Sequence, residues 1–270
     1  MDDNKLIGLQ RAEFNRAEIM GSYSNLVQVA IVIISMITIF ISVPPLCGYL
    51  ISVTNLILAI VWIYLLDKSK SSHSVAERAR RAIIFSKGLG IKLSSKSYTD
   101  LKMLFSVNEN DGTKYEDPNY FTASASYGNK KLAEIIEESS FWSKHLYKMS
   151  AQRYWRYFVA ILLISIIGLL LLPILNIGSA DILIAQVFSL ILIWVITGNI
   201  FTTAMSFTSA ASFVDNIETR LDSMAAHNEF DDVLIIVSDY NALVGSTPII
   251  PSNLYDRNKD RLNKLWAERT

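Results

Sequence analysis

Residues 131–172 carry the sequence KLAEIIEESSFWSKHLYKMSAQRYWRYFVAILLISIIGLLLL, which passes from a charged half to an apolar half without a proline. As a single helix this stretch would be about 60 Å long, at roughly 1.5 Å per residue. One half would lie in a lipid bilayer and the other half would stand in water. Residues 153–157, RYWRY, have the aromatic and basic side chains that are typical of a headgroup boundary. The stretch therefore predicts a membrane protein with a cytosolic helical stalk.

Three more stretches are apolar and free of Asp, Glu, Lys and Arg, namely 26–43, 46–66 and 182–200. Each is close to the length of about 20 residues that a helix needs to cross a bilayer. Two prolines end the first stretch, and residues 173–181 precede the last one. The sequence therefore predicts four transmembrane helices in two hairpins. Active transporters usually carry a charged side chain inside a span. The absence of such a side chain from these stretches argues against active transport, but it is compatible with a weakly selective pore.

The expected fold class is an all-α membrane protein with four transmembrane helices in two hairpins, long cytosolic helical extensions and a mostly α cytosolic domain. The expected parts are a cytosolic N-terminal segment (1–25), a first transmembrane hairpin (26–66), a cytosolic insert with a sensor or regulatory role (67–156), a second transmembrane hairpin (157–213) and a cytosolic C-terminal segment that packs with the insert (214–270).

Local patterns predict the elements of the polar segments. A short surface helix is expected within residues 1–24. The capping-box pattern SVAE at 74–77 predicts a helix start, and Gly88 and Gly90 are natural stops for that helix. Further predictions are a short helix at 98–105, a loop at 108–128, a strand or buried helix at 233–237 and a terminal helix at 255–266.

The distribution of charge predicts the orientation in the membrane. The two hairpin turns carry one charge between them, Asp181, whereas every Lys and Arg lies in the other three segments. Cytoplasmic loops of membrane proteins hold the excess of Lys and Arg. We therefore expect a multi-pass protein of the inner (plasma) membrane whose insert and two termini are cytoplasmic.

The composition excludes several kinds of function. The chain has 25 Lys and Arg against 25 Asp and Glu, so it offers no global positive field to a nucleic acid polymer. Its one cysteine, Cys47, excludes an internal disulfide. The three histidines are far apart, and neither Gly-x-Ser-x-Gly nor His-Glu-x-x-His occurs. We therefore expect no enzymatic activity, no catalytic residues, no metal site and no cofactor.

Small side chains recur at every fourth position of the last span and its extension, at Gly198, Thr202, Ser206 and Ala210. This spacing lets helix backbones approach closely, and hydroxyl groups can form hydrogen bonds across the contact. Two interpretations stay open, packing within one subunit and an oligomer seam or hydroxyl-lined pore. Asn199, near the cytoplasmic end, is the polar residue of most interest for the second.

Arg78, Arg80 and Arg81 form a basic cluster that closely follows the second span. Such residues either contact anionic lipid headgroups or hold an anionic ligand through forked guanidinium donors. Tyr120 and Phe121 follow a turn, where they either stack on a base or pack on the stalk helix. Both pairs of interpretations stay open.

Two membrane hairpins around a soluble insert of this size, followed by a cytosolic tail, resemble the S-4TM family. That family is predicted to supply four-span, pore-forming effectors of bacterial cyclic-nucleotide antiphage systems (CBASS). The resemblance covers most of the chain, mainly as architecture. Local similarities lie near Tyr23, at 118–121 (PNYF), at 141–142 (FW) ahead of 153–155 (RYW), and at 246–248 (STP) before Tyr255 and Arg257. The chain departs from the family in having no Trp near 88–93.

The resemblance implies a membrane effector that senses a cyclic oligonucleotide and then oligomerises or opens to permeabilise the bacterial inner membrane in antiphage defence. A cyclic oligonucleotide carries a charge on each phosphate and presents flat bases, so its receptor needs positive donors near aromatic faces. The residues expected to supply them are Arg78, Arg80, Arg81, Tyr120, Phe121, Arg153, Tyr154, Tyr255 and Arg257. The alternative is a membrane scaffold or passive channel whose insert binds a partner protein.

Overall fold

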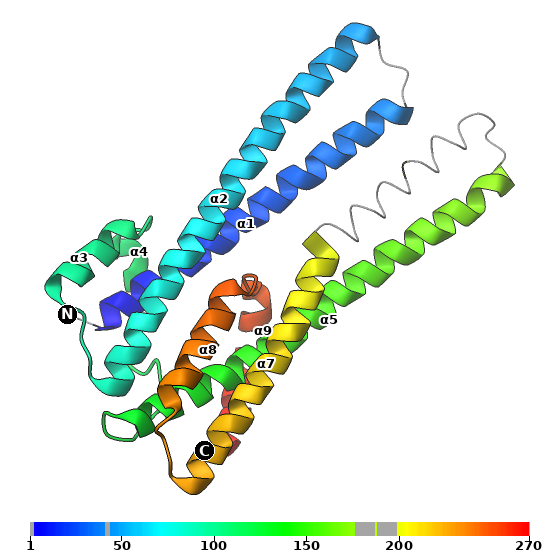
Figure 1. Cartoon of the computed structure of the whole chain (residues 1–270). Coiled ribbons are helices and arrows are strands. Elements are labelled where there is room, and N and C mark those ends of the chain that lie inside the picture. Colours follow the sequence, from blue (N-terminus) through cyan, green and yellow to red (C-terminus); the bar gives the residue numbers. More distant parts are fainter. Residues whose placement is uncertain (1–2, 41–43, 176–186, 188–198, 270) are drawn as a thin grey trace.

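The structure is a computed structural model that describes residues 3–40, 44–175, 187 and 199–269. All regular elements of the described residues are α-helices, as the sequence predicted (Figure 1). In chain order they are α1 (Asp3–Phe40), α2 (Pro45–Leu89), α3 (Ser95–Leu104), α4 (Glu109–Thr113), α5 (Asn129–Leu175), α7 (Asn199–His227), α8 (Val233–Ser246) and α9 (Ser252–Arg269).

Three of these helices, α1, α2 and α5, are long and apolar enough to cross a membrane. Almost none of the side chains in their apolar portions is buried inside the protein. Water would penalise so much exposed apolar surface, whereas lipid tails are as apolar as these side chains. The chain therefore has the composition of a multi-pass helical membrane protein. The fourth predicted span, 182–200, lies almost entirely outside the described residues, so the number of four spans stays a prediction.

The long helices pass from the apolar to the polar segments without a break. α5 alone is 47 residues long, which corresponds to about 70 Å. α2 ends where predicted, at Gly90, whose φ of 73° is a left-handed conformation that favours glycine. The Gly90 N–H donates to the Ser86 carbonyl oxygen at 3.0 Å. Each of these helices is thus continuous from its polar end to its apolar end.

In space, α1 lies along α2 and α5 lies along α7 (Figure 1). The two pairs approach each other where α2 contacts α5, and they diverge toward the apolar ends of α2 and α5. α8 contacts α2, α5 and α7, whereas α9 lies on α5. We call the part outside the apolar stretches, residues 3–25, 67–156 and 201–269, the extramembrane domain.

The extramembrane domain has three hydrophobic clusters. The largest lies between α5, α7 and α8 and includes Ile136, Tyr147, Phe207 and Tyr240. A second cluster joins α1, α2 and α3. A third joins α5 to α9 through buried aromatic and aliphatic side chains. The stalk helix α5 therefore packs hydrophobic side chains against α7 and α8 in one cluster and against α9 in another.

Several local predictions need correction. The SVAE pattern at 74–77 does not start a helix, because α2 already runs through it and supplies the carbonyl acceptors that a cap would replace. The expected surface helix within 1–24 is the beginning of α1 rather than a separate element. α5 continues through Pro173 to Leu175, past the expected end of the span at 172. Pro173 has no N–H, so one backbone hydrogen bond of this last turn is not formed.

Other local predictions agree with the structure, except over part of one loop. The short helix expected at 98–105 is α3, and the terminal helix expected at 255–266 is α9. Residues 233–237, predicted as either a strand or a buried helix, belong to the helix α8. The loop predicted at 108–128 is wrong over Glu109–Thr113, where a capping box between Asn108 and Asp111 stabilises the short helix α4.

Candidate functional site

A buried ion pair within α2 is linked to α8 through its arginine, inside the extramembrane domain. Arg80 Nη2 lies 2.8 Å from Glu77 Oε2, and Arg80 Nε donates to the same oxygen at 2.9 Å. Arg80 Nη2 also donates to Asn241 Oδ1 at 3.2 Å. The guanidinium carbon lies 5.1 Å from the ring centroid of Tyr240, within the range of a cation–π contact. The charge of Arg80 is therefore fully compensated by protein groups.

The environment of this pair keeps its charges fixed. Burial opposes the charged guanidinium, but the Glu77 carboxylate outweighs this cost, and the pKa of Arg80 is raised above its ordinary value. Burial also raises the pKa of Tyr240, so its hydroxyl stays neutral. That hydroxyl donates to the carbonyl oxygen of Ser139 at 3.1 Å and lies 2.8 Å from Ser143 Oγ. A ligand would have to displace Glu77 in order to reach Arg80.

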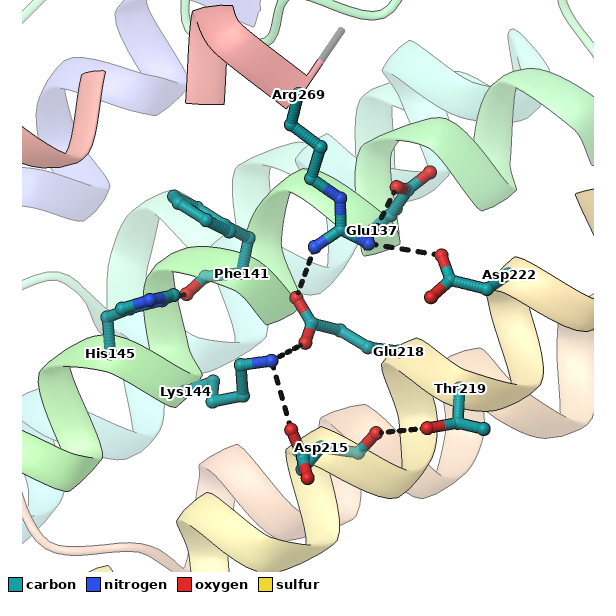
Figure 2. Close-up of polar contacts among 9 residues, drawn as sticks. All are labelled: Glu137, Phe141, Lys144, His145, Asp215, Glu218, Thr219, Asp222 and Arg269. Carbon is teal, nitrogen blue, oxygen red and sulfur yellow. Dashed lines mark hydrogen bonds and ion pairs between the residues drawn. The ribbon is translucent and has the colours of Figure 1, made fainter. Parts of the chain in front are cut away.

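A second charged network joins α5 and α7 (Figure 2). Lys144 on α5 forms an ion pair with Glu218 on α7, and its Nζ lies 3.0 Å from Asp215 Oδ1. Burial alone would lower the pKa of Lys144, but its hydrogen bonds to Glu218 and Asp215 outweigh burial and raise that pKa. The hydrogen bond from Lys144 lowers the pKa of Asp215. Both sides of the network are thus charged near neutral pH.

The end of α9 completes this network. Arg269 lies 3.1 Å from Glu218 Oε1, 3.2 Å from Glu137 Oε1 and 3.0 Å from Asp222 Oδ1 (Figure 2). One turn earlier, the ring of Trp266 packs on Phe141 of α5 with centroids 5.2 Å apart. Because Glu218 is buried and contacts both Lys144 and Arg269, it connects three helices. Tertiary contacts of α9 thus reinforce the α5–α7 pair.

A groove of two adjoining chambers, which we call the α1 groove, runs along one side of α1. The chambers have volumes of about 240 and 250 Å³ and share Asn15 and Ile19. The first is also lined by Ala12, Arg16, Met20, Ser106, Val107, Asp111, Lys114 and Tyr115. The second is also lined by Glu18, Ser22, Tyr23 and Ser252.

The wall of the first chamber opposite α1, which includes Ser106 and Val107, is held to α1 by hydrogen bonds and close backbone packing. Glu13 Oε2 accepts hydrogen bonds from the backbone N–H groups of Ser106 and Val107, at 3.0 and 3.1 Å. α4 approaches α1 so closely that a Cβ atom at Gly8 would lie 2.5 Å from the carbonyl oxygen of Gly112. Only glycine fits at such a distance. The groove is therefore preformed by backbone contacts rather than by mobile side chains.

The structure does not collect the predicted ligand residues into one pocket. Arg78 and Arg81 on α2 and Arg257 on α9 are exposed, whereas Arg80 is buried in its ion pair. Arg153 donates to Asn253 Oδ1 at 2.7 Å. Ligand binding by these arginines stays a prediction, and for Arg80 it would require a rearrangement.

The predicted aromatic faces are occupied by protein side chains. Tyr120 and Phe121 pack edge to face with centroids 4.7 Å apart, and Phe121 lies against the largest hydrophobic cluster. The ring of Tyr154 lies 5.8 Å from Phe207, and that of Tyr255 lies 5.6 Å from Trp142. Packing on the stalk helix, one of the two interpretations left open for the turn aromatics, therefore accounts for Phe121. Base stacking by these residues stays a prediction.

The predicted seam of small residues divides into two parts. Gly198 lies outside the described residues, and Asn199 is the first residue of α7. Ala210 is buried in the cluster between α5, α7 and α8, which is packing within one subunit. Thr202 and Ser206 are exposed. An oligomer seam or pore lining stays a prediction for these two residues.

Sequence reasoning missed the charged groups that matter most in the structure. The acidic side chains at 215, 218 and 222 recur at helical spacing, and this pattern was a usable signal for the network around Glu218. No local signal marked Arg16 or Lys114, because their proximity depends on how α4 packs on α1. Among the described residues, no three His, Cys, Asp or Glu side chains gather as metal ligands.

Comparison with known proteins gives no match to a protein family, a curated protein or a solved structure. Within the described residues the chain is all-α, with three candidate membrane helices that a charged helical domain connects.

Proposed function

We propose that the chain is a membrane effector whose extramembrane domain receives a chemical signal and whose spans open or assemble to permeabilise a bacterial inner membrane in antiphage defence. The proposed signal is a cyclic oligonucleotide, and both termini are cytoplasmic in this proposal. The observation that carries it is the continuity of α1, α2 and α5 from their apolar portions into the extramembrane domain. No flexible linker separates the receiving part from the membrane part of these helices.

Contacts within the extramembrane domain support a coupled response of the two helix pairs. Arg80 joins α2 to α8, and Lys144 joins α5 to α7. The N–H of Ser252 at the start of α9 donates to Glu18 Oε1 on α1 at 2.7 Å. A ligand that shifts one of these helices would therefore change the spacing of others.

The exposed apolar helices support assembly into a homo-oligomer. Their apolar portions do not form a closed bundle within the described residues, so lipid or other copies of the chain must cover them. Helices that are not committed to an internal bundle can change neighbours on activation. This is the property that a pore formed by assembly requires.

The proposal is tested by inducible expression in bacteria, with and without co-expressed synthases of cyclic di- and trinucleotides, while a potential-sensitive dye reports the membrane potential. We expect depolarisation only when one of these nucleotides is made. Reporter fusions at Asn110 and at the C-terminus should read cytoplasmic, and a fusion at Asn176 should read external. Constitutive depolarisation would instead indicate a passive channel. No depolarisation with any nucleotide would leave the membrane scaffold as the better description.

A further inference from the structure

The α1 groove contains a guanidinium that no protein carboxylate compensates. The Nε atom of Arg16 is buried and has no hydrogen-bond partner. In the described part of the chain, Arg16 forms no ion pair within 4.0 Å. Arg80, by contrast, pairs with Glu77 and Asn241. A buried donor without an acceptor is costly, and a ligand that supplies the acceptor removes this cost.

The two carboxylates nearest to Arg16 in the sequence are engaged elsewhere. Glu18 Oε1 accepts a hydrogen bond from the backbone N–H of Ser252 at 2.7 Å. Glu13 lies one turn before Arg16 on α1, but its Oε2 accepts two backbone N–H groups of the α3–α4 loop. Rotation of Glu13 toward Arg16 would release that loop from α1. The groove therefore keeps the charge of Arg16 available.

A second cation lines the same chamber from α4. The Nζ of Lys114 lies 5.0 Å from the ring centroid of Tyr115, which also lines the chamber. The one carboxylate in the lining, Asp111, accepts from the backbone N–H of Asn108 at 3.2 Å as part of the capping box. The lining of the first chamber therefore has two cations and one carboxylate, which gives it a net charge of +1.

The second chamber has a different character and leads toward the predicted membrane boundary. Tyr23 and Ile19 are among its lining residues and are largely exposed. Residue 23 lies three positions before the apolar stretch that begins at 26. A ligand held at Arg16 would sit about 15 Å along the helix axis from that stretch, on the helix that enters it.

We infer that the α1 groove binds a phosphodiester, with Arg16 and Lys114 as donors to its oxygens and with Tyr115 and Tyr23 beside its uncharged part. A guanidinium matches phosphate oxygens in geometry and stays charged at any physiological pH. A phosphodiester carries one negative charge, which equals the excess positive charge of the first chamber. Two sources share this chemistry, a free cyclic oligonucleotide and the headgroup of an anionic phospholipid.

This inference deepens the proposed function, on which it rests for the nucleotide source, by naming the ligand chemistry and its site. The binding step is measured separately from permeabilisation. Full-length protein in a maltoside detergent is titrated calorimetrically with cyclic di-AMP, cyclic di-GMP and cyclic tri-AMP. In a second arm, the same protein is titrated with short-chain phosphatidylglycerol.

We expect the wild-type chain to bind at least one of these phosphodiesters. Arg16→Gln and Lys114→Gln should each weaken binding by about tenfold to a hundredfold, because each removes one charge-assisted hydrogen bond. Lys114 is exposed, so its substitution tests the site without risk to the fold. The matched controls Lys92→Gln and Lys96→Gln each remove one exposed cation that lines neither chamber, and they should bind like the wild type.

Three results separate this inference from the proposed function. Unchanged binding in both Arg16→Gln and Lys114→Gln would overturn the groove as the site, while nucleotide-dependent depolarisation would keep the function. Binding of phosphatidylglycerol alone, weakened by both variants, would support the groove as a lipid site and remove it as the nucleotide sensor. A wild-type chain that binds none of these phosphodiesters would overturn the inference.

Discussion

The α1–α2 and α5–α7 pairs are both antiparallel, yet different contacts hold them together. Along α1–α2, hydroxyl groups and small residues bring the backbones close. Ser69 Oγ donates to the carbonyl oxygen of Ala17 at 2.7 Å, and a Cβ at Gly21 would lie 3.1 Å from that same Oγ. Along α5–α7, large rings meet, with Tyr147 and Phe207 centroids 5.9 Å apart and Tyr154 and Phe207 centroids 5.8 Å apart. The α1–α2 contact has a ring pair of its own, Phe14 on His73, with centroids 5.6 Å apart.

This difference indicates how the two pairs respond to force. Small residues and single hydrogen bonds give contacts that can shift along the helix axis at low cost. Interlocking aromatic rings and a buried carboxylate shared by two cations favour one arrangement. We therefore expect the α1–α2 pair to shift more readily than the α5–α7 pair.

The largest effect is expected for Arg80→Ala. This change leaves Glu77 buried without its partner, and breaking such a pair typically costs about 3–5 kcal/mol of unfolding free energy. Denaturant unfolding of the detergent-solubilised protein measures the cost. Arg78→Ala, two residues away on the exposed side of α2, is the control and should change little. Equal stability of the two variants would show that the Arg80 pair does not stabilise the fold.

Glu218→Gln should have the next largest effect. It keeps the shape of the side chain but removes the charge that Lys144 and Arg269 share, at a cost of about 1.5–3 kcal/mol. Protection of α9 amides from hydrogen exchange should fall with it, because Arg269 loses its buried partner. The exposed Glu229→Gln serves as the control. If α9 stays equally protected in both variants, its hydrophobic contacts alone hold it on α5.

Alkaline pH should weaken the same network more gradually. The pKa of Lys144 is raised in the folded state above its ordinary value of 10.5. Its contribution to stability is therefore complete below pH 10.5 and is lost as the pH rises through the folded-state pKa. Unfolding curves measured across this range should lose that pH dependence in Lys144→Met. An identical alkaline profile for both proteins would assign the loss to other groups.

Asn55→Leu should change the α1–α2 pair only slightly. Asn55 Nδ2 donates to Ser35 Oγ at 3.1 Å between the two helices, whereas Asn55 Oδ1 is buried without a partner. Hydrogen bonds between membrane helices average about 0.6 kcal/mol, and removal of the unpaired oxygen offsets part of this. Unfolding in mixed micelles measures the change. A loss as large as that of Arg80→Ala would contradict the view of α1–α2 as the adaptable pair.

The smallest effect on the stability of the single chain is expected for Ser206→Leu, because Ser206 is exposed on α7. If this face is an oligomer seam, the added bulk should block close approach and reduce the oligomer fraction seen by native mass spectrometry. Ser209→Leu, exposed three residues further along the same helix, is the matched control. Normal assembly of both variants would remove Ser206 from the proposed seam.

The sequence by itself determined the class of the protein and the positions of its long helices. Apolar stretches without charge require a lipid environment, and a helix is the form that satisfies the backbone there. This argument located the apolar portions of α1, α2 and α5 without reference to other parts of the chain. A local signal also sufficed for the stop at Gly90, since a left-handed glycine acts within a single turn. The start of α3 at Ser95, which Ser94 caps, was expected three residues too late, at 98.

Only the tertiary structure decided which charged residues are bound internally and which remain available. Arg78, Arg80 and Arg81 look equivalent in sequence, yet only Arg80 faces Asn241, which is 161 positions away. Arg16 gains its significance from an α3–α4 loop that occupies Glu13 from 93 positions away. The physical reason is that a charge acquires its role from the partner that packing brings to it. For Arg80, a residue far away in the sequence supplies a hydrogen-bond partner. For Arg16, no such partner reaches the buried Nε atom.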